Sequence, residues 1–176
     1  MQRNKLFLPV FAVTAAGGAL LAVLGAPYGQ FMALTFAGTE LGLRVALEGF
    51  PSGGEGLLLA DCAFAFGYAF LLSAAARDLA PGSGSPAAGR LLAWAIWIGA
   101  AADVAENLML IQVLKGGSPA AAPWLRAAAV LKFALFVAAC GWVGGASWRA
   151  GRKIWSAWAL AAGTGAIAAF LPSLLG

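Results

Sequence analysis

The chain has 176 residues, of which 62% are hydrophobic and 10% are charged, and its formal net charge is +4. A soluble domain carries a charge on about a quarter of its residues, so this composition excludes a water-soluble globular fold. The basic residues lie beside apolar segments and not in a patch interleaved with aromatic side chains, which argues against nucleic-acid binding. The sequence therefore predicts a protein whose main solvent is lipid.

Metal and redox chemistry have little support in the sequence. There is no histidine, and the two cysteines, Cys62 and Cys140, stand apart within apolar segments. This excludes histidine-ligated haem and histidine acid–base catalysis, and it offers no Cys/His ligand cluster for a metal. We expect no metal, no cofactor, and two buried cysteines that pack as small hydrophobic side chains.

Five apolar segments are long enough to cross a bilayer, since roughly 20 helical residues cover about 30 Å of hydrocarbon. The first follows Arg3 and Lys5 as a signal-peptide core would, but it is longer than the roughly 7–15 residues of such a core, so we expect it to remain uncleaved. The sequence predicts an all-α, polytopic membrane helix bundle, with residues 1–176 in a single membrane-embedded domain. The five predicted transmembrane helices cover residues 6–24, 57–76, 91–114, 127–147 and 154–174.

Residues 28–50 are apolar but carry a charged stripe. Glu40, Arg44 and Glu48 are spaced four apart, which places them on one helical face, with the acid ahead of the base as favoured in helices. A helix with one charged stripe lies more easily at the membrane surface than across the bilayer. We predict an interfacial amphipathic helix over residues 31–49, and a sixth span with a polar stripe is the alternative.

Lysine and arginine are unequally divided between the two sides of the five-span arrangement. Seven lie on the side of the amino terminus and three on the other. Because basic residues accumulate in cytoplasmic loops, we predict a multi-pass protein of the inner (cytoplasmic) membrane with a cytoplasmic amino terminus. The seven are Arg3, Lys5, Arg77, Arg90, Arg149, Arg152 and Lys153, and the three are Arg44, Lys115 and Arg126.

Tryptophan is concentrated near the ends of the predicted spans, where indole prefers the membrane interface. We therefore interpret these residues as interfacial anchors and not as a ligand box. They are Trp94, Trp97, Trp124, Trp142, Trp148, Trp155 and Trp158.

A few polar side chains fall inside the predicted spans, where a charge at the helix centre costs about 2.5–3.5 kcal/mol on insertion scales. Asp103, Glu106 and Asn107 share one face of the third span, because they are separated by three and four residues. That face must point into the bundle, since lipid would leave it unsatisfied. The candidate site residues are Asp61 and Tyr68 in the second span, Asp103, Glu106 and Asn107 in the third, and Lys132 in the fourth.

Helical rise places these groups at similar depth. At about 1.5 Å per residue, Asp61 lies about 6 Å and Lys132 roughly 9 Å below the outer ends of their spans. The acids of the third span lie roughly 10–16 Å below its outer end. All would occupy the outer half of the bilayer, and Tyr68 shares the face of Asp61 from two turns deeper.

Formal charge does not balance within this group, because three carboxyl groups face one lysine. One interpretation is a satisfied network of ion pairs and hydrogen bonds that only holds the helices together. The other is a site for a proton, an ion or a cationic ligand, since the excess acid must be protonated or neutralised.

The run Ala102-Asp103-Val104-Ala105-Glu106-Asn107-Leu108, followed by Leu131-Lys132-Phe133, forms an Asp-x-x-Glu-Asn … Lys pattern. It resembles a pattern in uncharacterised multi-pass bacterial membrane proteins, as does Asp61 in an aromatic-rich span. The resemblance covers about half of the chain, from the second to the fourth span, and implies a membrane fold without implying an activity.

Three functions are compatible with these features. The first is a module that binds or transports a small molecule, a lipid or a proton at an acidic intramembrane site. The second is a structural or assembly subunit of a membrane complex. The third is an intramembrane enzyme acting on a lipid-like substrate, with Glu106 or Asp103 as general acid or base and Lys132 as an electrostatic stabiliser. We expect membrane lipids as partners, together with a small amphiphilic or cationic ligand, another membrane protein or a second copy of the chain.

Overall fold

The computed structural model describes residues 33–50 and 54–175, which are helical and contain no strand. The first predicted span, residues 6–24, lies outside the described residues. The other four predicted spans each coincide with a helix. These helices are α4 (Gly54–Leu79), α5 (Pro86–Leu114), α6 (Ala122–Arg149) and α7 (Lys153–Leu175), joined by turns that include η1 (Ala80–Gly82) and η2 (Pro119–Ala121).

Among the described residues, three helical segments are long and apolar enough to cross a membrane. They are Gly54–Gly82, Pro86–Leu114 and Pro119–Arg149, and they contain the predicted second, third and fourth spans. The predicted all-α membrane fold is thus confirmed for these segments. The sequence predicts two further spans, at residues 6–24 and 154–174, and for these two segments the membrane crossing stays a prediction.

The helices extend beyond the predicted spans because hydropathy locates only their apolar centres. Helix α5 begins at Pro86, five residues before the predicted start, and α6 begins at Ala122, also five residues earlier. Proline fits the first turn of a helix, where its missing N–H has no intrahelical partner. Both helices therefore start at a Pro-containing turn and pass one arginine, Arg90 or Arg126, before their apolar centres begin.

The chain divides into two compact units. Unit 1 contains the described residues up to Tyr68 together with Ala102–Ala129, and unit 2 contains Ala69–Ala101 together with the residues from Val130 onward. Helices α4, α5 and α6 each contribute one part to unit 1 and another to unit 2. The two units are therefore described separately.

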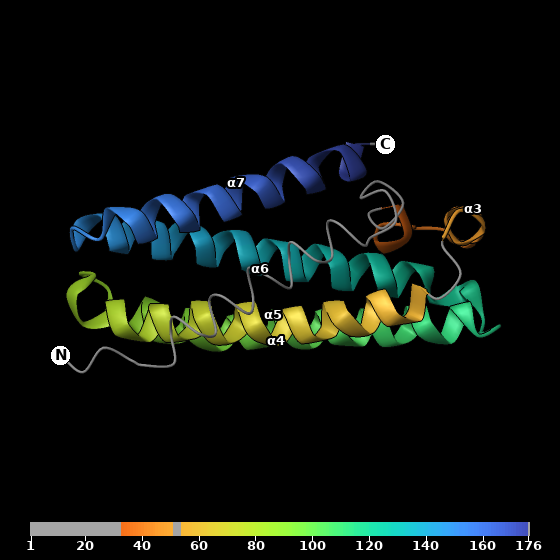
Figure 1. The fold of residues 1–176 in the computed structure, drawn as a ribbon, viewed down its shortest axis with the longest axis horizontal. Helices are drawn as coiled ribbons and strands as arrows, with labels where there is room; N and C mark the ends of the chain where they lie inside the picture. The colour runs from red at the N-terminus through yellow and green to blue at the C-terminus, as the bar shows by residue number, and fades with distance from the viewer. Residues whose placement is uncertain (1–32, 51–53, 176) are drawn as a thin grey trace. The chain divides into compact units, whose positions relative to one another are not determined.

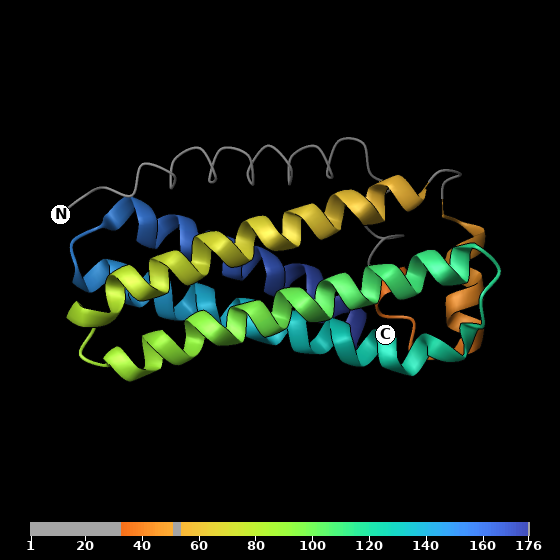
Figure 2. The ribbon, with the colours of Figure 1, turned by 90° about the horizontal axis from the view of Figure 1, so that it is seen from below.

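Unit 1 is closed at one end by a short helix, α3 (Glu40–Glu48). In Figure 1, α3 is seen along its axis, whereas the unit 1 parts of the long helices run across the page. Figure 2 shows α3 from the side. Helix α3 therefore lies across the ends of these helices, packing against η2. The buried apolar core beneath it consists of Leu34, Ala37, Leu43, Phe50, Leu58, Leu110, Val113, Ala122 and Leu125.

The predicted helix over residues 31–49 is wrong in its first half, and residues 31–32 lie outside the described residues. The helix that includes residues 33–35 stops, and α3 starts anew at Glu40. Thr39 causes the restart, because its extended backbone and its Oγ1, which accepts from Gly42 N at 3.1 Å, form an N-cap. This interruption also rules out a single spanning helix over residues 28–50. Glu40, Arg44 and Glu48 are exposed, which agrees with the predicted charged face of this helix.

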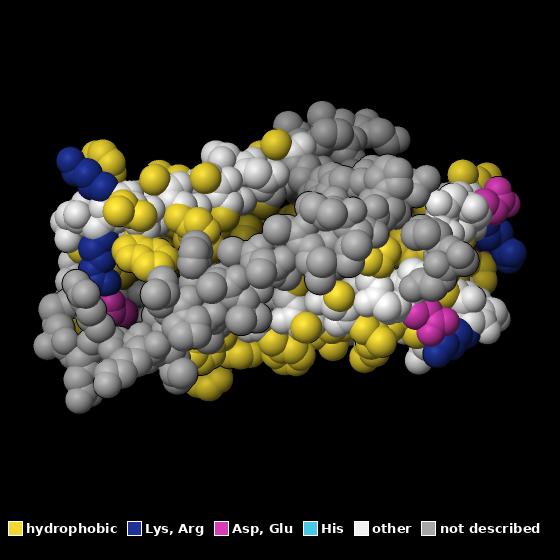
Figure 3. Space-filling model, in the orientation of Figure 1, with side chains coloured by type: hydrophobic (Ala, Val, Ile, Leu, Met, Phe, Trp, Pro, Cys, Tyr) yellow, Lys and Arg dark blue, Asp and Glu magenta, His cyan; other side chains and the backbone are white. Residues whose placement is uncertain are grey.

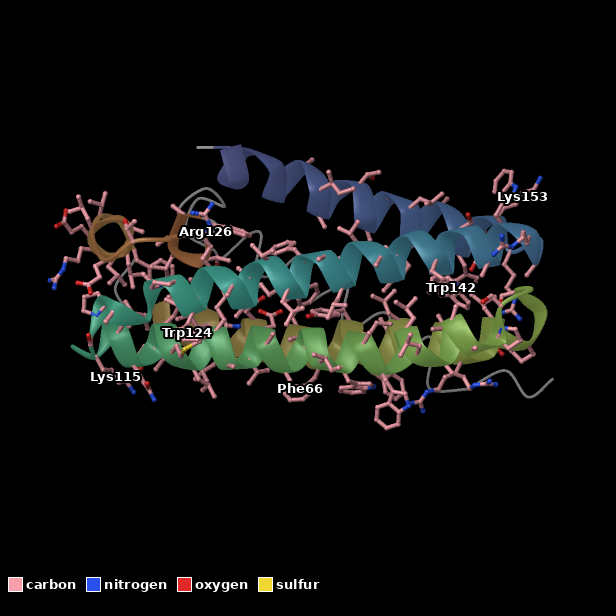
Figure 4. All side chains as sticks on the ribbon, turned by 180° about the vertical axis from the view of Figure 1, so that it is seen from behind. Phe66, Lys115, Trp124, Arg126, Trp142 and Lys153 are labelled. Atoms are coloured by element: carbon pink, nitrogen blue, oxygen red, sulfur yellow. The ribbon has the colours of Figure 1, made fainter. Side chains whose placement is uncertain are left out.

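Unit 2 is held together by close approaches at glycine. A Cβ at Gly144 on α6 would lie 2.9 Å from Leu160 on α7, and one at Gly163 on α7 would lie 3.0 Å from Cys140 Cβ. The ring of Trp142, labelled in Figure 4, packs onto Gly89 at the start of α5, where a Cβ would lie 2.7 Å from it. Small residues at such positions let membrane helices pack closely.

Helices α5 and α6 both end in a glycine with positive φ, Gly116 (91°) and Gly151 (72°). After α6, Arg152 N donates to Ser147 O at 2.9 Å and Gly151 N donates to Trp148 O at 3.0 Å, which is the Schellman pattern of a helix end. The sharp reversal into α7 at residues 149–153 follows from this cap.

We expect Gly151→Ala to destabilise the protein by about 1–2 kcal/mol, because an L side chain is strained in the left-handed region. Gly145→Ala is the matched control, since Gly145 is helical and a Cβ there meets no described atom within 4 Å. Alanine should be neutral there or stabilise by about 0.5–1 kcal/mol. Denaturant unfolding in detergent measures both, and equal effects of the two substitutions would contradict the assigned cap.

Candidate functional site

The candidate site in unit 1 is a polar cluster formed by two helices. Asp61 and Tyr68 come from α4, and Asp103, Glu106 and Asn107 come from α5. All five side chains are buried, with exposed fractions of 9% for Asp61, 5% for Asp103 and 0% for Glu106 and Asn107. Five of the six predicted site residues therefore lie in one unit and inside the protein.

Two hydrogen bonds join the helices across this cluster. Asn107 Nδ2 donates to Asp61 Oδ2 at 3.0 Å, and Tyr68 Oη donates to Asp103 Oδ2 at 3.2 Å. The order of the two pairs shows that α4 and α5 are antiparallel. Asp61 precedes Tyr68 on α4, whereas its partner Asn107 follows Asp103, the partner of Tyr68, on α5. Tyr68, which was predicted to share the face of Asp61, reaches the acids of α5 through its bond to Asp103.

The opposite faces of the same helices carry exposed apolar side chains. On α4 these are Leu59, with 56% exposed, and Phe66, with 55% exposed, and Phe66 points away from the helices in Figure 4. On α5 Leu108 is 48% exposed. At about 100° per residue, these positions lie roughly opposite Asp61 and Asp103. The predicted inward orientation of the acids is thus confirmed, with a lipid-compatible surface behind them.

Sequence reasoning overlooked two neighbours of the cluster. The ring of Phe64 contacts that of Tyr68 edge-on, with the ring centroids 5.8 Å apart. This contact restricts the orientation of the Tyr68 side chain, whose hydroxyl donates to Asp103. Cys62, whose side chain lies near Asn107, is only partly buried, so the prediction that both cysteines are buried is wrong for Cys62. The spacing of four between Phe64 and Tyr68 was the available signal. Cys140 is buried, as predicted.

The cluster is rich in oxygen acceptors. Besides the three carboxyl groups it contains Asn107 Oδ1, which is fully buried and accepts no hydrogen bond from the described residues. Such an arrangement can hold a donor: a protonated carboxyl, or the N–H or O–H of a bound molecule. The described residues include no group of three or more His, Cys, Asp or Glu side chains arranged to hold a metal ion.

Lys132, the sixth predicted site residue, belongs to α6 in unit 2. Its side chain is 7% exposed, and its ammonium lies 5.5 Å from the centroid of the Phe133 ring. The backbone of Lys132 passes Gly99 of α5, where a Cβ would lie 3.8 Å from the Lys132 Cα. The lysine is therefore buried, as predicted, and its meeting with the acids stays a prediction.

Comparison with models of protein families, with curated proteins and with solved structures finds no match to this chain. The site must accordingly be interpreted from its own chemistry.

We expect Asn107→Ala to destabilise the protein by about 1–3 kcal/mol, because it removes a donor from the buried Asp61 carboxyl. Gln112→Ala is the control, as it deletes an exposed amide from the same helix and should cost less than about 0.5 kcal/mol. Denaturant unfolding in detergent compares the two variants. If Asn107→Ala is no more harmful than Gln112→Ala, the bond to Asp61 contributes nothing.

Proposed function

We propose that this protein is a membrane-embedded binding or transport module whose polar cluster takes up a proton or a small cationic ligand. The observation that carries the proposal is the composition of its buried charge. Among the described residues, three side chains that can carry a negative charge are buried: Asp61, Asp103 and Glu106. One buried side chain, Lys132, carries a positive charge. Even with Lys132 counted against one acid, two carboxyl groups remain in excess.

Buried carboxylates in such excess are costly when ionised, because desolvation of a carboxylate costs several kcal/mol even after relaxation. Charge balance is reached when a carboxyl group holds a proton or when a cationic ligand enters. The Asn107 and Tyr68 donors orient Asp61 and Asp103 without adding positive charge. These neutral donors supply hydrogen bonds to the carboxyl groups and leave the excess of acid unchanged. A site that binds and releases a proton requires such an excess.

A second candidate, a structural or assembly subunit, is favoured by the same two hydrogen bonds. Asp61–Asn107 and Tyr68–Asp103 tie α4 to α5 at two levels, which is what a structural lock needs. A structural lock needs no excess of acid, however, whereas the cluster also contains the fully buried carboxyl group of Glu106. The response to loss of Glu106 therefore separates the two functions.

The proposed orientation places the amino terminus and the residues around Arg77 and Arg149 in the cytoplasm of an inner-membrane protein, because these ends carry most of the basic residues. In this arrangement α3 is an interfacial helix on the outer side, where its nine residues span only about 14 Å. The polar cluster then lies in the outer half of the bilayer.

We expect a reporter fused at Ser118, in the turn before η2, to give an extracytoplasmic signal. A second fusion at Gly84, in the turn between α4 and α5, should give a cytoplasmic signal and serves as the control. A cytoplasmic signal at Ser118 would contradict the five-span orientation.

Proton movement tests the function itself. With the protein in vesicles and a pH-sensitive dye inside, we expect an imposed pH gradient to collapse faster than in empty vesicles. Glu106→Gln should reduce the excess rate at least tenfold, because the amide cannot exchange the proton.

The matched control is Glu55→Gln, which removes a carboxylate from the same unit, exposed and paired with Lys115 at 3.2 Å. This variant should retain the wild-type rate. Equal rates in Glu106→Gln and the wild type would instead favour the structural role.

A further inference from the structure

Unit 2 has a strongly basic end, where α4 leads into α5 and α6 turns into α7. Figure 3 shows Lys and Arg side chains gathered at this end of unit 2, and Lys153 marks it in Figure 4. The sequence of unit 2 contains a single acid, Asp78. The basic end is defined by Arg77, Arg90, Arg149, Arg152 and Lys153.

The one acid is already matched. Arg152 NH1 donates to Asp78 Oδ2, which ties the turn after α6 to the end of α4. Because residues i and i+1 of a helix do not face the same direction, Asp78 is directed away from its neighbour Arg77. The positive charge of Arg77 is therefore not offset by the acid beside it in sequence.

Arg77 instead lies over an aromatic ring at the lipid-facing surface. Its guanidinium carbon is 5.7 Å from the centroid of Trp94, and the Trp94 side chain is 66% exposed. An exposed indole at the end of a spanning helix marks the depth of the lipid headgroups. The contact consequently holds a guanidinium at headgroup depth.

Arg90 adds a second cation to the same face. It precedes Trp94 by four residues on α5, which places both side chains on one helical face, and it is exposed. Leu91, 73% exposed, precedes Trp94 by three residues and therefore lies next to the indole, where it offers apolar contact on the lipid side. One guanidinium thus lies over the indole, and a second cation shares the helical face of that indole.

We propose that the face formed by Arg77, Arg90 and Trp94 binds the headgroup of an anionic phospholipid. Arginine forms paired hydrogen bonds with phosphate oxygens, the indole lies at the glycerol level, and Leu91 contacts the acyl chain. The partner is a lipid and not a soluble phosphate, because the cations are joined to an exposed apolar surface that a free anion would leave unused. The site is independent of the polar cluster in unit 1.

Native mass spectrometry of the full chain with equal amounts of phosphatidylglycerol and phosphatidylcholine of matched acyl chains tests the proposal. The wild type should bind phosphatidylglycerol in preference. Arg77→Gln/Arg90→Gln should lower that preference roughly tenfold or more, since each basic residue near the surface contributes about fivefold.

The control pair is Arg44→Gln/Arg126→Gln, which removes the same formal charge from exposed arginines of unit 1. It leaves the proposed site intact and should lower the preference less than about threefold. Equal losses in both double variants would contradict a localised site, as would a wild type without preference. Displacement of the lipid by an equal concentration of soluble glycerol phosphate would also overturn the proposal. Should the first double variant fail to fold, Arg90→Gln alone must still lower the preference roughly fivefold.

Discussion

A carboxyl group in a membrane helix must face protein, and this constraint fixes how α4 and α5 meet in unit 1. Asp61 accepts a hydrogen bond from Asn107 because that face of α5 turns toward it, and the bond from Tyr68 to Asp103 sets the same rotation two turns further along α4. Rotating either helix would expose acids to lipid and bury the side of Leu108. The helix orientation and the candidate site are therefore consequences of one set of hydrogen bonds.

The two units use their polar residues differently. In unit 1 three acids are buried, whereas Lys115 and Glu55 form an exposed ion pair at 3.2 Å near the ends of their helices. In unit 2 basic residues remain exposed at one end, where Arg77 lies over Trp94 and Lys153 lies 6.0 Å from the Trp148 ring. Exposed cations beside exposed indoles suit the headgroup region of a membrane, whereas buried acids suit an exchangeable proton within it. Both proposals follow from where each kind of charge lies.

The spacing of residues in the sequence predicted the features that depend on one helix alone, such as which side chains share a face. The spacing of Asp103, Glu106 and Asn107 placed them on one inward face, which the structure confirms. The interruption of the helix before α3 could not be predicted from hydropathy, because it arises from a local hydrogen bond of Thr39 that competes with an apolar run favouring continuation. The environment of Cys62 depends on the register between two helices, which a one-dimensional pattern does not contain. The meeting of Lys132 with the acids depends on register too, and it stays a prediction.

The central proposal is that the polar cluster takes up a proton or a small cationic ligand, and in the purified protein without added ligand we expect it to hold a proton. Infrared difference spectroscopy of the purified protein detects this directly, since a protonated carboxyl has a C=O stretching band that a carboxylate lacks. The account predicts such a band in the wild type at pH 7, reduced in Glu106→Gln, Asp61→Asn or Asp103→Asn, and unchanged in Glu55→Gln. A spectrum at pH 7 with only carboxylate bands, the same in the wild type and in all three cluster variants, would contradict it.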